Sequence, residues 1–140
     1  MKTIALRTAE GRFIAHEVQI VYSLAARWLA LSRAQSLPTR AGLLLIPARG
    51  IHTLGMRFAV DVVFLSRQMR VVGLAPLVPP WRVLLAPRGT GQVLELAAGQ
   101  IAATGLKTGT FIVVESNQQR APIAFSLRLP LRHEDRNPAQ

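Results

Sequence analysis

The feature that most constrains the fold is a series of short apolar runs from Gly42 onward, each bounded by glycine, proline or polar residues. Runs of roughly four to eight β-branched and leucine residues between such breaks are typical of strands. The runs that predict strands are 43–46, 58–65, 70–74, 93–96, 111–115 and 123–129. Their spacing favours a mainly β fold, a small sandwich or a partly open barrel with one or two short helices.

The part of the chain before Gly42 predicts a hairpin and a helix. Residues 2–8 and 13–22 alternate isoleucine and valine with polar residues around a glycine turn, which indicates two paired strands. Ser23 precedes apolar residues at helical spacing, and Pro38 prevents the helix from continuing. A second, short helix is expected within residues 97–104.

The composition indicates one folded domain. Half of the 140 residues are hydrophobic and 17% are charged, which is too apolar for a disordered basic segment. We expect a single β-rich domain over residues 1–131 and a flexible polar tail at 132–140. The absence of cysteine excludes disulfides, thiolate nucleophiles and cysteine-bound metals. No export signal or membrane span is evident, so a cytoplasmic location is expected by default.

The net charge of +10 is compatible with an anionic partner, and it is equally typical of a basic surface that is simply solvated. An anionic ligand, a membrane surface and an acidic protein all fit this charge. A nucleic acid is less favoured, because the arginines are dispersed along the chain and no reading helix or aromatic RNA-binding motif accompanies them.

The segment 51–65 combines a polar loop with a strand that carries an acidic residue. Strand alternation places Asp61 between apolar neighbours, on the face opposite Phe58. A buried carboxylate without partners is strongly destabilising, so donors are expected nearby. The candidates are loop amides, His52, or an arginine from elsewhere such as Arg27 or Arg82.

Several motifs of this chain occur together in one known family. They are Ile51-His52-Thr53, Gly55-Met56-Arg57-Phe58, Asp61 with the apolar residues after it, Ala26-Arg27-Trp28-Leu29, and Val93-Leu94-Glu95-Leu96. Over about residues 20–115 the chain resembles the uncharacterised prokaryotic domain-of-unknown-function family 192. The resemblance implies a small, mainly β fold with one or two short helices, and it implies no established activity. The chain departs from the family at Ala59, where proline is usual, and at Thr110, where aspartate is usual.

The sequence favours a non-catalytic binding or accessory module over an enzyme. The expected site is a small polar pocket beside the loop at residues 51–58. Its candidate ligand- or partner-binding residues are His52, Thr53, Met56, Arg57, Asp61, Arg82 and Glu95. The alternative interpretation is that the polar members only tie the loop to the strand through internal hydrogen bonds, while Met56 fills the core.

No catalytic residue, metal or cofactor is predicted. The three histidines are scattered, no serine lies in a nucleophile elbow, and no phosphate loop or dinucleotide fingerprint is present. Two alternative functions stay open. The first is a small hydrolase-like enzyme in which Asp61, Glu95 and His52 converge, and the second is a basic nucleic-acid-binding protein.

Overall fold

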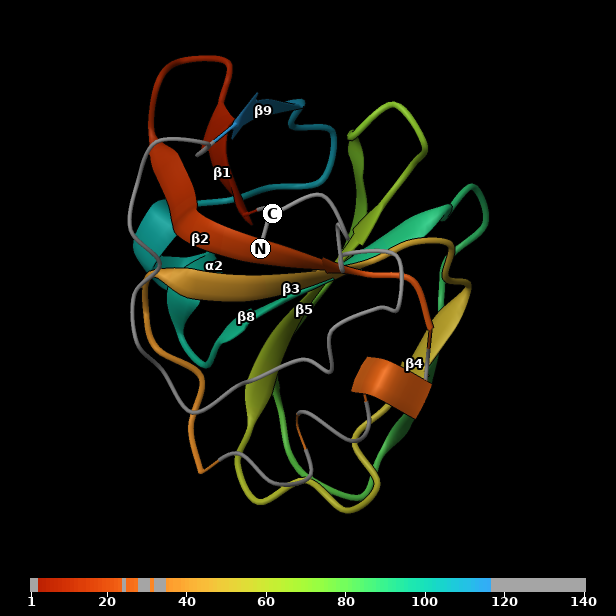
Figure 1. Cartoon of the computed structure of the whole chain (residues 1–140). Helices are drawn as coiled ribbons and strands as arrows, with labels where there is room; N and C mark the ends of the chain where they lie inside the picture. Colours follow the sequence, from red (N-terminus) through yellow and green to blue (C-terminus); the bar gives the residue numbers. More distant parts are fainter. Residues whose placement is uncertain (1–2, 24, 28–30, 32–34, 117–140) are drawn as a thin grey trace, which may run out of the picture.

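A computed structural model describes residues 3–23, 25–27, 31 and 35–116 of the chain (Figure 1). The strand predicted at 123–129 and the tail predicted at 132–140 lie outside the described residues. Within the described part, the fold is mainly β with two short helical segments, as the sequence predicts. No helix in this part is long and apolar enough to cross a membrane.

The main element is a seven-stranded sheet in the order β6-β5-β8-β3-β2-β1-β9. Its strands are β1 (Thr3–Thr8), β2 (Phe13–Val21), β3 (Ala41–Leu45), β5 (Val60–Leu65), β6 (Val71–Val78), β8 (Gln92–Ala97) and β9 (Ile112–Ser116). All neighbours pair antiparallel except β2 and β3, which are parallel. The predicted hairpin is therefore the β1–β2 pair.

The parallel pairing of β2 with β3 needs a crossover connection, and the predicted first helix lies in it. Residues 25–27 and 31 are helical. The Oγ of Ser23 accepts the backbone N–H of Ala26 at 3.1 Å, so Ser23 caps the start of this helix. The second helix, α2 (Gln100–Thr104), lies within the range expected for it.

The sheet curls until its two edge strands meet at one end (Figure 1). A bridge pairs Arg70, just before β6, with Phe111, just before β9. Beside it, the N–H of Ile112 donates to the carbonyl of Met69, and the N–H of Val71 donates to that of Thr110, both at 2.9 Å. The two edges touch only over this short stretch, so the prediction of a partly open barrel is confirmed.

The two faces of the sheet bury separate apolar clusters, and strand β5 contributes to both. Val62 and Phe64 pack in the cluster that also holds Leu31 of the first helix. Val63 and Leu65 point the other way, into the cluster that holds Ile101 of α2. The alternation predicted for this strand is confirmed, and it places Asp61 on the same side of the sheet as Val63 and Leu65.

A second, two-stranded sheet packs beside the first cluster. It consists of β4 (Gly50–His52) and β7 (Val83–Leu85), which pair antiparallel. The sequence did not predict either strand, because three residues are too few to show a period of two. Strand β6 also extends beyond its predicted end through Pro76, which an edge strand tolerates because its outer N–H groups need no partner.

Candidate functional site

Asp61 lies fully buried on β5 and accepts two backbone hydrogen bonds. Its Oδ1 accepts the N–H of Leu77 at 2.8 Å, and its Oδ2 accepts the N–H of Ile101 at 2.7 Å. Helix α2 has Gly99 at its N-cap and receives no side-chain cap from it, so Asp61 supplies the acceptor from a different strand. The donors are backbone amides of strand β6 and helix α2, whereas the sequence predicted loop amides, His52 or an arginine.

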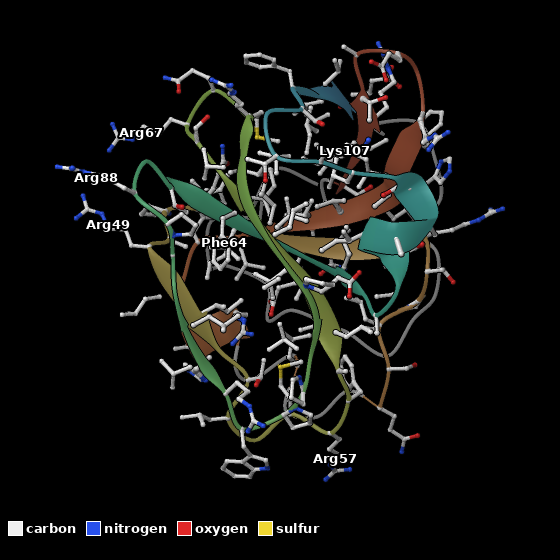
Figure 2. All side chains as sticks on the ribbon, turned by 180° about the vertical axis from the view of Figure 1, so that it is seen from behind. Arg49, Arg57, Phe64, Arg67, Arg88 and Lys107 are labelled. Carbon is white, nitrogen blue, oxygen red and sulfur yellow. The ribbon has the colours of Figure 1, made fainter. Side chains whose placement is uncertain are left out.

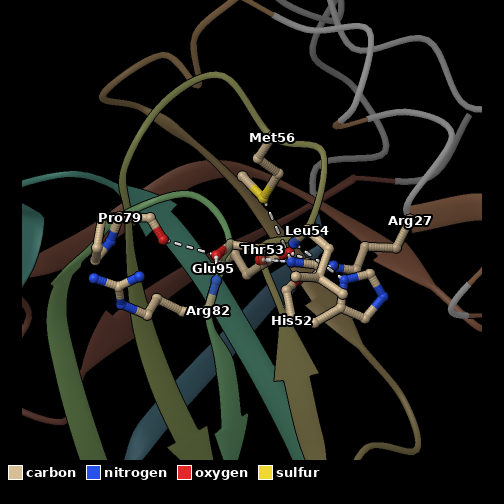
Figure 3. A network of polar contacts seen from close by, with 8 residues as sticks. All are labelled: Arg27, His52, Thr53, Leu54, Met56, Pro79, Arg82 and Glu95. Carbon is tan, nitrogen blue, oxygen red and sulfur yellow. Dashed lines mark hydrogen bonds and ion pairs between the residues drawn. The ribbon is translucent and has the colours of Figure 1, made fainter.

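Thr53 is fully buried and holds the turn that leads into β7 (Figure 3). Its hydroxyl donates to the carbonyl of Pro79 at 2.7 Å and accepts the N–H of Arg82 at 2.9 Å. Its N–H donates to the carbonyl of Arg82 at 2.8 Å, and its carbonyl accepts the N–H of Trp81 at 3.0 Å. All its polar groups are engaged within the protein, so Thr53 fastens residues 79–82 and has no free group to offer a ligand.

The two residues held by Asp61 and Thr53 share an unusual conformation. Leu77 and Trp81 have φ angles of 52° and 66°, in the left-handed region that residues with side chains avoid. This conformation costs about 1–2 kcal/mol for each such residue. Their side chains are nevertheless 61% and 66% exposed, so burial of the side chains does not offset the strain. Backbone strain that is stabilised by buried neighbours is characteristic of functional segments.

Arg27 and Glu95 form a buried ion pair on the other face of the sheet (Figure 3). The guanidinium contacts both carboxylate oxygens, with Nε to Oε2 at 2.9 Å and Nη2 to Oε1. Its Nη1 also donates to the carbonyl of His52 at 2.6 Å, and its Nη2 lies 3.7 Å from the Sδ of Met56. The ion pair therefore fastens the loop at 52–56 to strand β8.

The structure does not bring Asp61 and Glu95 together. In the pairing of β5 with β8, Asp61 lies opposite Leu96 while Glu95 lies opposite Val62. Directly paired residues share a face and successive residues alternate, so the two carboxylates point to opposite sides of the sheet. The convergence required for a hydrolase-like site is absent.

The remaining predicted residues either take part in a network of polar contacts or have side chains exposed on the surface. His52, Thr53, Met56, Arg82 and Glu95 belong to the contacts drawn in Figure 3. The His52 ring is half-buried, and its Nδ1 accepts the N–H of Leu54 at 3.3 Å. The side chains of Arg57 and Arg82 are exposed. Among the predicted residues, these two arginines are the most accessible to a partner.

The sequence did not reveal an exposed apolar strip, which consists of Trp81 and of Val83 and Leu85 on β7. Val83 is 66% exposed and Leu85 is 89% exposed, whereas Leu84 between them packs against the core. Trp81, Val83 and Leu85 occupy alternate positions, a spacing that could have been noticed. Because Leu84 is apolar as well, the segment lacks the contrast between polar and apolar faces that marks a half-buried strand.

Exposed arginines surround this strip. Arg82 lies within it, and the carbonyl of Arg49 accepts the N–H of Ala86 at 3.1 Å, directly after β7. Figure 2 shows the side chains of Arg49 and Arg88 extending into solvent on the same side of the molecule. We call the exposed side chains of Trp81, Arg82, Val83, Leu85, Arg49 and Arg88 the β7 face.

Exposed carboxylates lie away from the β7 face in the part of the chain that the structure describes. Glu17, Asp61 and Glu95 are buried. The exposed ones are Glu10, in the turn between β1 and β2, and Glu115 on β9, which pairs with Arg7. Figure 1 places these strands at the end of the molecule remote from β4. Among the described residues, the charged side chains of the β7 face are therefore all arginines.

A separate cavity of about 520 Å³ opens between the β1–β2 turn and the turns after α2. Its lining includes Thr8, Arg12, Thr110 and Phe111, and none of the predicted site residues. Over the described ranges, no three His, Asp or Glu side chains are grouped to hold a metal ion.

Comparisons with known proteins agree on the fold. The model of the family DUF192, described as "Uncharacterized ACR", matches residues 5–114. A candidate transcription regulator from Sinorhizobium meliloti 1021 has a similar structure, with a TM-score of 0.68 and 19% identity over 81% of this chain and 92% of that one. A protein of unknown function from Novosphingobium aromaticivorans has the same TM-score and identity over 79% and 83%. No curated protein matches the chain.

Proposed function

Because this chain belongs to the DUF192 family, whose description names no activity, we propose a function from its own geometry: it is a non-catalytic module that binds an anionic partner on the β7 face. One observation carries the proposal. Buried polar residues hold Leu77 and Trp81 in a strained conformation that leaves both apolar side chains exposed. Exposed arginines adjoin Trp81 and the strand after it.

A non-catalytic role is supported by how the buried carboxylates are used. Asp61 accepts two backbone N–H groups, and Glu95 pairs with Arg27. Both carboxylates are fully buried and lie on opposite faces of the sheet. Neither is positioned to exchange a proton with a substrate in a shared cleft.

The buried residues that were predicted to line a pocket support the binding surface in this proposal. Thr53, Met56, Asp61 and Glu95 are buried and engaged with other parts of the protein. The exposed residues, above all Trp81 and its neighbouring arginines, then contact the partner.

An anionic partner is favoured by the charge of the β7 face, which carries arginines and no exposed carboxylate among the described residues. The description of the Sinorhizobium protein raises a nucleic acid as the partner. The centre of the face does not favour that choice, since the exposed side chains of Val83 and Leu85 have no donor for a phosphate.

The test compares two charge reversals of equal size on an immobilised polyanion, heparin. Arg88→Glu changes the β7 face, whereas Lys107→Glu changes an exposed position after α2, away from Arg88 in Figure 2. The salt concentration that elutes the protein should fall clearly more for Arg88→Glu than for Lys107→Glu. Equal shifts would mean that retention reflects net charge alone, and the proposed binding face would then be wrong.

A further inference from the structure

The exposed apolar side chains at the centre of the β7 face identify the kind of partner more closely. We propose that this face docks on the surface of an anionic lipid bilayer, with Trp81, Val83 and Leu85 entering the interface. The inference rests on the proposed function and names the partner of the same surface. It starts from exposed fractions of 66%, 66% and 89% for these three side chains.

Val83 and Leu85 alternate on β7 and therefore project from the same face of that strand, and the exposed Trp81 lies two residues before Val83. Exposure this high means that each side chain protrudes into solvent and has few protein atoms around it. Protruding apolar groups suit a soft medium that can surround them, whereas a rigid protein partner must provide a matching hollow for each. Large apolar side chains that are exposed together on one short segment indicate an interaction surface.

The tryptophan fits the same environment. Its indole is apolar over most of its surface and carries one N–H donor, and such side chains are enriched at the boundary between lipid and water. Trp81 is held there by the hydrogen bond from its N–H to the carbonyl of Thr53. The left-handed backbone at Trp81 is thereby maintained without packing of the ring in the core.

Arginines adjoin the apolar side chains. Arg82 lies between Trp81 and Val83 in the sequence, and Arg49 and Arg88 lie beyond Leu85, with their side chains extending into solvent on the same side of the molecule (Figure 2). An arginine side chain can bury its stem at a lipid surface while the guanidinium remains among the headgroup phosphates. Anionic headgroups attract such a cluster, and no exposed carboxylate described on this face opposes them.

The experiment measures flotation of the full chain with vesicles of phosphatidylcholine alone and of phosphatidylcholine mixed with phosphatidylglycerol. We expect binding to the mixed vesicles, weaker binding at high salt, and little binding to phosphatidylcholine. On binding, the tryptophan emission should shift to shorter wavelength, and the shift should disappear in Trp81→Phe. The comparison of the two vesicle compositions uses the unchanged chain, so it does not depend on whether a variant folds.

A matched pair of variants tests apolar insertion separately from charge. Val83→Ser should weaken partitioning into the mixed vesicles about fivefold, because apolar contact with the interface is lost. Val114→Ser is the control, since Val114 is a 46% exposed valine in strand β9, far from the β7 face. Circular dichroism melting of both variants verifies that each is folded.

Three outcomes would overturn the inference. The first is no flotation with mixed vesicles, and the second is flotation that Arg88→Glu weakens while Val83→Ser leaves it unchanged. The third is a dimer, detected by light scattering, that Val83→Ser dissociates, because a second copy would then occupy the face. If heparin still distinguishes Arg88→Glu from Lys107→Glu in these cases, the proposed anionic binding face stands and only the lipid partner fails.

Discussion

The carboxylate of Asp61 accepts the backbone N–H of Leu77 at 2.8 Å, so a buried charge on β5 fixes an exposed residue on β6. The same carboxylate also holds the start of α2 through Ile101. One side chain therefore connects two segments that are distant in sequence, and both connections run through backbone groups. A residue placed in this way is required for the shape of the surface, even though it does not reach that surface.

Replacement Asp61→Asn should destabilise the fold. The amide keeps one acceptor oxygen but turns an NH₂ group toward a backbone N–H, which leaves buried donors facing each other. We expect the free energy of unfolding in urea to fall by about 1–3 kcal/mol. Glu115→Gln is the control, because it alters an exposed ion pair with Arg7 and should cost less than about 1 kcal/mol. Equal stability of Asp61→Asn and the wild type would contradict a scaffold role.

Breaking the Arg27–Glu95 pair on one side should be more damaging than removing it altogether. Arg27→Met leaves the Glu95 carboxylate buried without its partner, and we expect a loss of about 3–5 kcal/mol in the free energy of unfolding. Adding Glu95→Leu to the same protein removes the unpaired charge and should recover most of this loss. Recovery stays incomplete, since the carbonyl of His52 still lacks its donor.

Chemical denaturation of the two single variants and the double variant gives the coupling between Arg27 and Glu95 directly. A double variant that loses as much stability as the two single variants added together would mean that the pair is not coupled. The interpretation that the pair fastens the loop at 52–56 would then fail.

The strain at Leu77 and Trp81 predicts that glycine is tolerated there. Glycine adopts a positive φ without steric penalty, so Leu77→Gly and Trp81→Gly should leave the melting temperature unchanged or raise stability by about 1 kcal/mol. Met69 is a control, because its φ is 65° but its side chain packs against the core. Met69→Gly should therefore lose stability. A marked loss for Trp81→Gly would show that its ring stabilises the fold and would remove the strain argument.

The large sheet was predictable from the sequence because its strands are apolar runs separated by turn residues. Strand β5 also revealed the burial of Asp61, since alternation alone places that residue among apolar neighbours. The need of a buried carboxylate for donors predicted that it has partners, but the donors are amides of β6 and α2 rather than the loop amides, His52 or arginine that were expected. These features follow from local pattern and from the energetics of a single group.

The features that carry the proposed function depend on contacts between distant residues. Arg27 and Glu95 are 68 positions apart, and no spacing rule pairs them. The left-handed residues Leu77 and Trp81 escaped detection because glycine, the usual signal of a positive φ, is absent from both positions. The conformation there is imposed by Asp61 and Thr53 from other parts of the fold, so the local sequence does not record it.

Thr53 allows the support of the β7 face to be weakened without touching the face itself. Thr53→Val keeps the shape of the side chain but removes the hydroxyl that joins Pro79 to Arg82. Amide hydrogen exchange at Trp81 and Arg82 should become faster, and global stability should fall by about 1–3 kcal/mol because buried groups lose their partner.

The conservative change Thr53→Ser retains the hydroxyl and should restore slow exchange at both amides. Amides of strand β8, such as that of Leu94, report global opening and serve as the internal reference. The prediction requires Thr53→Val to accelerate amide hydrogen exchange at Trp81 and Arg82 more than at Leu94, because the hydroxyl fastens only the segment at 79–82. Equal acceleration at all three positions would mean that Thr53 supports the core as a whole. In that case the segment at 79–82 would not be a separately held surface, and the binding face would lose its structural basis.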